Sequence, residues 1–198
     1  MKYTLYFIAR PIITIFMKLF YKVEIINKEN IRDKNALLVG NHTSNLDALL
    51  VISSTKRNIR FLAKQELFKP VLKKLFLNAG VIPVNRKQKS PLSISLAETA
   101  LNNNELVCIF PEGTINKTNN TLLPFKYGSV SLASKTSSLL VPFVIKGKYK
   151  LFRKSVSIKF LSPYHLETNN LELENNKLMK IKKSIKEHCE KNIAKYAM

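Results

Sequence analysis

The sequence predicts a single α/β domain whose central sheet is mixed but largely parallel and is flanked by helices. The chain has 198 residues, 45% of them hydrophobic, which suits one domain with its own core. Short apolar runs alternate with helical patterns, as in sheets built from strand–helix–strand units. The last two apolar runs lie close together in sequence, so we expect the final strands to make the sheet mixed.

The predicted strands are apolar runs at residues 36–40, 58–63, 80–85, 106–110, 139–146 and 156–161. Helical patterns fall at 45–55, 66–78, 91–102, 127–137 and 172–196. The last of these carries one apolar stripe on a Lys-rich helix, which predicts packing first and a membrane contact second. The stripe consists of Leu178, Ile181, Ile185, Cys189, Ile193 and Tyr196.

The N-terminal segment, residues 5–21, is strongly apolar but is interrupted by Arg10 and Lys18. A spanning helix needs about 20 mostly uncharged residues, and a signal peptide needs a small-residue cleavage site, which does not follow this segment. We therefore predict an amphipathic, membrane-associated interfacial helix over residues 1–22, with its cations toward lipid phosphates. The alternative is a helix packed on the protein's own core. Pro11 predicts a kink or a helix start.

The charge of the chain points to an anionic partner. Lys and Arg number 33 against 13 Asp and Glu, which gives a net charge of +20. Nucleic acid and acidic lipid headgroups both fit this charge. However, the chain has no zinc-finger spacing and no aromatic RNA-binding signature, and its basic residues are spread along the whole sequence. We therefore do not expect a nucleic-acid partner.

The two cysteines, Cys108 and Cys189, lie far apart and form no CxxC pair. Without His at ligand spacing, they predict neither a metal site nor a disulfide. Cys108 lies in an apolar run, where a small buried thiol is the simplest interpretation.

A polar turn after the first long apolar run contains a candidate general base. His42 follows the strand at 36–40, and the carboxyl ends of strands are where open α/β sheets bind ligands. A helix is expected to begin near Ser44 or Asn45, which would put Asp47 in its first turn, within reach of the imidazole. A His held in one tautomer by a carboxylate can take a proton from a hydroxyl. Alternatively, His42 only caps the helix and Asp47 only stabilises its positive end.

A second turn, Phe110-Pro111-Glu112-Gly113-Thr114, follows the strand at 106–110. It combines a carboxylate, a flexible glycine and a hydroxyl at another carboxyl end of the predicted sheet. The alternative is a surface turn with a solvated glutamate.

Taken in order, four segments resemble the conserved blocks of the glycerolipid acyltransferase family. They are Asn41-His42-x4-Asp47, Gly80 to Arg86, Phe110 to Thr114, and Val141-Pro142-Phe143. The segments 61–67 and 124–128 also look like that family, so the resemblance covers residues 36–147. Within the family, the chain is most similar to bacterial 1-acylglycerol-3-phosphate acyltransferases.

The resemblance implies an acyltransferase domain over residues 23–198 and a reaction in phospholipid biosynthesis. His42 would deprotonate the free hydroxyl of lysophosphatidic acid and Asp47 would orient His42, so that phosphatidic acid is formed. The acyl donor would be a thioester of acyl-carrier protein or coenzyme A, with no further cofactor. The enzyme would be peripheral or monotopic at the cytoplasmic face of the cell membrane. Glycerol-3-phosphate or another lysolipid is the alternative acceptor.

The resemblance also implies which residues bind the acceptor. Glu112, Gly113 and Thr114 would line its site, and Arg86 and Lys64 are candidates for its phosphate. Many relatives read Phe-Pro-Glu-Gly-Thr-Arg-Ser, whereas this chain has Ile115-Asn116 after Thr114. Isoleucine cannot bind phosphate, so we expect another cation to replace the arginine. The candidates are Arg86, Lys64, Lys117 and Lys126, and we favour Arg86 because it ends a strand.

Overall fold

The described part of the chain comprises residues 3–31, 34–85, 91–118, 121–126 and 128–164 in a computed structural model. Four helical residues near the C-terminus, Lys183, Glu187, Glu190 and Lys191, are also described. The rest of the helix predicted at 172–196 lies outside the described residues.

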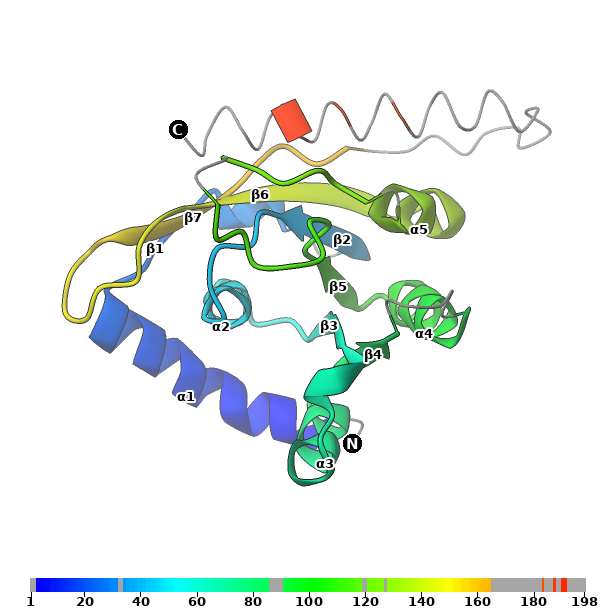
Figure 1. The fold of residues 1–198 in the computed structure, drawn as a ribbon, viewed down its shortest axis with the longest axis horizontal. Coiled ribbons are helices and arrows are strands. Elements are labelled where there is room, and N and C mark those ends of the chain that lie inside the picture. The colour runs from blue at the N-terminus through cyan, green and yellow to red at the C-terminus, as the bar shows by residue number, and fades with distance from the viewer. Residues whose placement is uncertain are drawn as a thin grey trace.

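The centre of the fold is a sheet of seven strands in the order β1-β7-β6-β2-β5-β3-β4, counted over the described residues (Figure 1). The pairs β2·β5, β2·β6, β3·β5, β3·β4 and β1·β7 are parallel, and β6·β7 is antiparallel. The predicted mixed, largely parallel sheet is therefore confirmed. The strands are β1 (Glu24–Ile26), β2 (Ala36–Gly40), β3 (Ile59–Lys64), β4 (Ile82–Val84), β5 (Leu106–Ile109), β6 (Leu139–Gly147) and β7 (Val156–Phe160).

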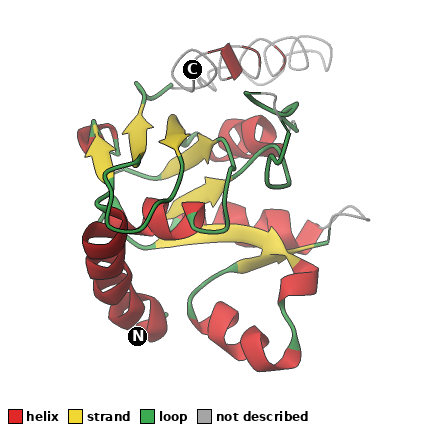
Figure 2. Cartoon of the chain, turned by 60° about the vertical axis from the view of Figure 1, so that its left-hand side comes forward, coloured by secondary structure: helices red, strands yellow, loops and turns green. Residues whose placement is uncertain are grey.

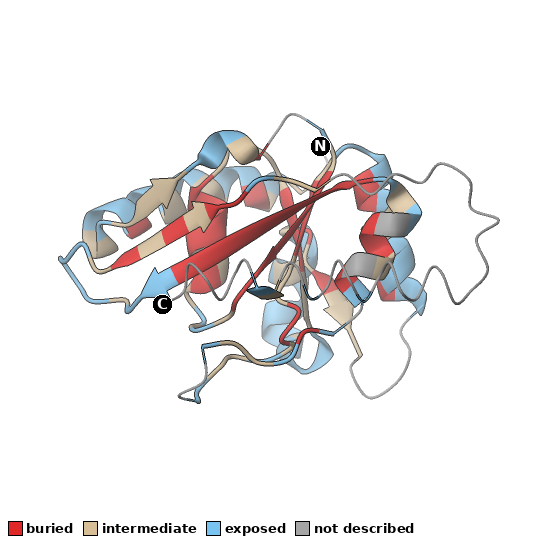
Figure 3. Ribbon diagram, turned by 90° about the horizontal axis from the view of Figure 1, so that it is seen from above, coloured by how far each residue is buried: buried red, intermediate tan, exposed pale blue. Residues whose placement is uncertain are grey.

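Helices cover both faces of this sheet (Figure 2). Leu38 of β2 points into a buried cluster that includes Met17, whereas its neighbour Leu37 points into a second cluster that includes Leu101. Because successive strand residues face opposite sides, both faces of β2 are buried. Figure 3 shows the central strands coloured as buried. The helices are α1 (Thr4–Tyr21), α2 (Asp47–Ser53), α3 (Pro70–Asn78), α4 (Pro91–Asn102) and α5 (Gly128–Thr136). The first cluster lies under α1 and α2, and the second under α4 and α5.

All six predicted strands are present, but β1 was missed, because three half-buried residues carry no clear periodicity. The expected start of a helix at Ser44 or Asn45 is wrong. These residues form a turn closed by a hydrogen bond from Asp47 N–H to the Ser44 carbonyl, and α2 begins at Asp47. A helix start at Pro11 is also wrong, because α1 begins at Thr4 and runs through this proline.

One side of α1 packs on the domain. Met17 is fully buried, and the Arg10 guanidinium donates to the Thr55 carbonyl at 2.7 Å. The opposite side exposes Phe7, Ile8, Ile12, Ile15 and Leu19. Among the described helices, α1 is the one long and apolar enough to cross a membrane by length and composition. One side of α1 therefore packs on the core, as the alternative expects, and the other side is apolar and exposed.

Candidate active site

His42 and Glu112 lie together because of the register between β2 and β5. Val39 of β2 pairs with Ile109 of β5 in parallel, and each candidate residue lies three positions after its member of this pair. Both side chains therefore lie at the carboxyl edge of the sheet, where α/β proteins bind ligands. β3 is the other neighbour of β5, and it ends at the same edge with Lys64.

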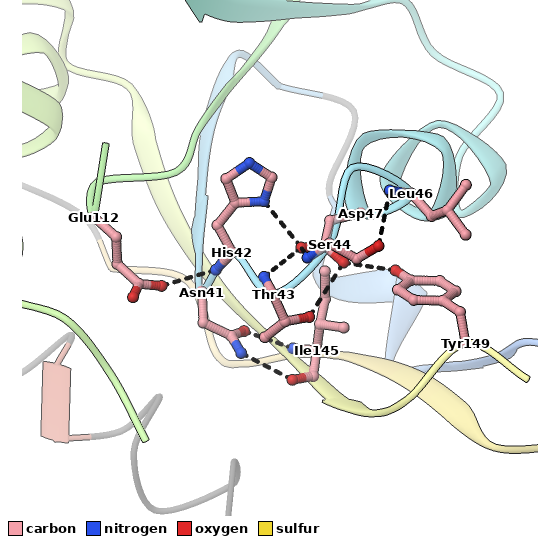
Figure 4. A network of polar contacts seen from close by, with 9 residues as sticks. All are labelled: Asn41, His42, Thr43, Ser44, Leu46, Asp47, Glu112, Ile145 and Tyr149. Carbon is pink, nitrogen blue, oxygen red and sulfur yellow. Dashed lines mark hydrogen bonds and ion pairs between the residues drawn. The ribbon is translucent and has the colours of Figure 1, made fainter. Parts of the chain in front are cut away.

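The imidazole of His42 contacts the carboxylate of Asp47, as the sequence predicts. The distance from Nδ1 to Asp47 Oδ2 is 2.9 Å (Figure 4). The same oxygen accepts the backbone N–H groups of Thr43 at 2.6 Å and Ser44 at 2.8 Å. Asp47 is fully buried, and these donors, together with the N-terminus of α2, stabilise its charge. With Nδ1–H donated to Asp47, the lone pair of His42 lies on Nε2, ready to accept a proton.

Aromatic rings fix the plane of this imidazole. The Phe110 ring stacks on His42, with centroids 4.1 Å apart, and Phe143 meets Phe110 edge-on at 6.0 Å. Phe143 occupies the space where a Cβ on Gly40 would be, since such a Cβ would come within 2.1 Å of the ring. The glycine before Asn41-His42 therefore allows the packing that supports the histidine.

Glu112 points inward and holds two loops together. Its carboxylate accepts the backbone N–H of His42 and that of Leu123, each at 2.8 Å. Burial raises the pKa of Glu112 above its usual value of 4.5, although these two hydrogen bonds act in the opposite direction. The backbone N–H of Asn116 donates to the His42 carbonyl at 2.7 Å. The loop that carries His42 is thus bound on both sides by the loop after β5.

The Pro-Glu-Gly-Thr turn brings a cation to the site. Gly113 has a positive φ of 73°, and the Nζ of Lys126 lies 3.0 Å from the position that a Cβ on Gly113 would occupy. The backbone N–H of Lys126 donates to the Pro111 carbonyl at 3.0 Å, which holds the lysine beside the turn. Thr114 is exposed at the end of the same turn.

The other candidate cations differ in position. Lys64 is half exposed, and its Nζ lies 4.0 Å from Glu66 Oε1. Lys117 is exposed in the loop after Thr114. Arg86, our favoured candidate, lies outside the described residues.

No group of three His, Cys, Asp or Glu side chains that could hold a metal ion occurs within the described part of the chain. Cys108 is buried, as predicted, and burial raises the pKa of its thiol well above the usual value.

Sequence reasoning missed a further partner of Asp47. The hydroxyl of Tyr149 donates to Asp47 Oδ1 at 2.7 Å from a position 102 residues further along the chain (Figure 4). No spacing or motif in the sequence signals this contact. Phe110 was noted as part of a motif, but its stacking on His42 was not anticipated either.

Comparison with known proteins agrees with this geometry. Residues 22–146, more than half of the chain, match the family model described as Acyltransferase. The chain belongs to the acyltransferase family. The resemblance inferred from the ordered motifs is thereby confirmed for this acyltransferase.

Curated relatives of this chain carry the name 1-acyl-sn-glycerol-3-phosphate acyltransferase. The protein from Helicobacter pylori is 32% identical over 162 residues, which cover 78% of this chain and 66% of the relative. The one from Borreliella burgdorferi is 32% identical over 141 residues, which cover 68% and 55%. The chain thus spans between half and two thirds of the length of these relatives.

A solved structure has the same fold. The 1-acyl-sn-glycerophosphate (LPA) acyltransferase from Thermotoga maritima superimposes with a TM-score of 0.66 at 22% identity. The match covers 96% of this chain and 80% of that one.

Proposed function

We propose that this acyltransferase transfers a fatty acyl group from an acyl thioester to the free hydroxyl of lysophosphatidic acid and so forms phosphatidic acid. The observation that carries the proposal is the contact of 2.9 Å between His42 and the buried Asp47 at the carboxyl edge of the sheet. A family match and relatives that bear this activity in their names support the same reaction.

In the proposed mechanism, His42 acts as a general base through Nε2. It takes the proton of the acceptor hydroxyl while the oxygen forms a bond to the thioester carbonyl carbon. The carbon–sulfur bond then breaks, and the imidazolium returns the proton to the departing thiolate. Asp47 stabilises the imidazolium and keeps Nδ1 protonated, which leaves Nε2 free for this cycle. The acyl group thus passes directly from the thioester to the acceptor, without a covalent enzyme intermediate.

The phosphate of the acceptor needs cationic partners. Because this chain has Ile115 where many relatives have arginine, another cation must take that role. Lys126 is supported by its position beside Gly113, at the turn that follows Glu112. Lys64 ends β3 at the same edge, and Arg86 follows β4 in the sequence, so both remain candidates. Glu112 would act on the acceptor site indirectly, by holding the loop of His42, whereas Gly113 and Thr114 would line it.

We also propose that the acyltransferase binds the cytoplasmic face of the cell membrane as a peripheral or monotopic protein. The apolar exposed side of α1 supports an interfacial position. α3, which contacts α1, exposes Val71, Leu72 and Leu75 beside Lys73 and Lys74. The net charge of +20 favours anionic lipid and an anionic acyl donor, either acyl-carrier protein or coenzyme A thioester.

The test is a lipid-product assay with the purified chain. Acyl-carrier-protein and coenzyme A thioesters would each be offered with lysophosphatidic acid, glycerol-3-phosphate and other lysolipids. We expect phosphatidic acid from lysophosphatidic acid, and about 10²–10⁴-fold slower formation by His42→Ala. Product from glycerol-3-phosphate or another lysolipid alone would identify the alternative acceptor. No transfer in any combination, together with nucleic-acid binding, would refute the proposal.

A further inference from the structure

Tyr149 completes the set of groups that surround the carboxylate of Asp47. Oδ2 faces His42 and two backbone N–H groups, whereas Oδ1 accepts the phenol of Tyr149 at 2.7 Å (Figure 4). The other contact of Oδ1, with the Thr43 hydroxyl, is long at 3.4 Å. Tyr149 is therefore the strong donor to the oxygen that faces away from the imidazole.

The phenol is held in its protonated, donating form. Burial, and next the charge of Asp47, raise the pKa of Tyr149 above the usual phenol value. A fully buried carboxylate is costly unless its lone pairs are occupied, and a hydrogen bond to a charged group is stronger than one between neutral groups. Tyr149 thus stabilises the charged carboxylate of Asp47 and restricts rotation of this side chain.

The ring of Tyr149 rests on the end of α1. Tyr21, the last residue of this helix, meets it edge-on with centroids 5.7 Å apart and an interplanar angle of 90°. The loop that carries Tyr149 has a second anchor on the same helix end, where Phe152 N–H donates to the Phe20 carbonyl and the two rings pack at 5.5 Å. A continuous series of contacts therefore runs from α1 through Tyr149 and Asp47 to His42.

We propose that Tyr149 is a positioning residue that holds Asp47 toward His42 and makes this pair depend on the position of the C-terminal end of α1. The role rests on the proposed acyl transfer with His42 as the base. If α1 lies in the membrane interface, the contacts link binding at the membrane to the orientation of the base.

The isosteric variant Tyr149→Phe tests the hydrogen bond without removing the ring. We expect kcat to fall about tenfold, because one charge-assisted bond is lost, with the KM values for acceptor and donor unchanged. The variant Tyr21→Leu should lower kcat in the same direction by removing the ring support, whereas Tyr21→Phe should retain it. Thermal unfolding of each variant would show that the fold is kept.

A pH profile separates positioning from a general loss of stability. The groups around Asp47 and Tyr149 are His42, Glu112, Cys108 and Tyr21, and all four remain in Tyr149→Phe. Losing the phenol leaves more negative charge on the oxygens of Asp47, which favours the protonated imidazole. The acid limb of kcat/KM should therefore move to higher pH in Tyr149→Phe and stay in place in Tyr21→Phe.

Imidazole NMR of His42 gives a readout that does not need activity. In Tyr149→Phe the midpoint of its titration should rise and the Nδ1–H resonance should move. An unchanged midpoint and an unchanged acid limb in a folded Tyr149→Phe would overturn the positioning role. If instead the wild-type enzyme transfers no acyl group while the NMR shift is present, the proposed function fails and the contact network stands.

Discussion

The ring of Phe110 lies nearly parallel to the imidazole of His42, with an angle of 15° between their planes and 4.1 Å between their centroids. The contact joins the carboxyl ends of β5 and β2, the two strands that deliver Glu112 and His42 to one edge of the sheet. The stacked Phe110 ring restricts rotation of the imidazole about its Cβ–Cγ bond. Such a rotation would turn the imidazole away from Asp47.

Phe110→Leu should keep the apolar contact but lose the stacked ring. A stacked aromatic pair contributes about 0.5–1.5 kcal/mol beyond its buried area, so we expect kcat to fall about 2- to 10-fold with little change in KM. Phe76→Leu is a matched control, because Phe76 of α3 forms a separate aromatic pair with Phe68, with ring centroids 5.5 Å apart. Equal losses in both variants would show that stacking on His42 has no special role.

His42→Ala should lower kcat by about 10²–10⁴-fold, the usual contribution of a positioned base. Asp47→Asn should also be impaired, because the amide cannot stabilise the imidazolium. Circular dichroism and thermal unfolding would establish that both variants fold. A folded His42→Ala enzyme with near-normal turnover would remove the proposed mechanism.

Glu112→Gln should change how stability depends on pH. Because burial raises the pKa of Glu112 in the folded protein, the folded state binds this proton more tightly than the unfolded state does. This contribution to the free energy of unfolding is fully present below pH 4.5 and is lost as the pH rises through the folded-state pKa. Glutamine has no such titration, and its amide nitrogen would face a backbone N–H at a cost of about 1–3 kcal/mol.

Denaturant unfolding of the wild type and Glu112→Gln at several pH values measures this difference. The difference in the free energy of unfolding between the wild type and Glu112→Gln should shrink as the pH rises above 4.5. A difference that stays constant across this pH range would mean that burial does not control this carboxyl group.

Lys126→Met should raise the KM for lysophosphatidic acid about tenfold or more while the KM for the acyl donor changes little, because a charge-assisted phosphate contact is lost. Lys56→Met is the matched control, since Lys56 lies exposed before the amino end of β3, at the edge of the sheet opposite the site. Arg86→Ala tests the candidate that the sequence favours in the same assay. Unchanged acceptor kinetics in Lys126→Met would exclude it as the phosphate ligand.

Membrane binding by α1 is best tested without deleting the helix. Deletion would also remove the buried Met17 and expose the core residues against which it packs. Ile12→Glu and Ile15→Glu alter side chains that are 64% and 65% exposed, so the fold should be kept. Sedimentation with anionic vesicles should show weaker binding by both variants. High salt should weaken wild-type binding only in part, because apolar insertion is not screened. Vesicle binding by Ile12→Glu and Ile15→Glu that equals wild-type binding would exclude this surface as the anchor.

The elements that the sequence predicts well are those whose signal is local. The run 36–40 is apolar on both faces, and β2 has those bounds because both of its faces are buried. The contact of His42 with Asp47 was predictable for the same reason. The two residues are only five positions apart, and Asp47 lies in the first turn of a helix. Contacts between residues far apart in the sequence have no such local signal. β1 depends on β7, and Tyr149 reaches Asp47 across 102 positions, so neither could be inferred from nearby residues.

The pairing of β1 with β7 constrains the order in which the chain can fold. Glu24, the first residue of β1, and Lys154, just before β7, form an ion pair at 3.1 Å although 130 positions separate them. During synthesis β1 leaves the ribosome early, yet its partner emerges only after almost the whole sheet. The edge that carries β1 therefore closes late, after the parallel core has formed. Until then α1 is tethered to an unpaired strand, and its apolar side can reach a bilayer before the enzyme is complete.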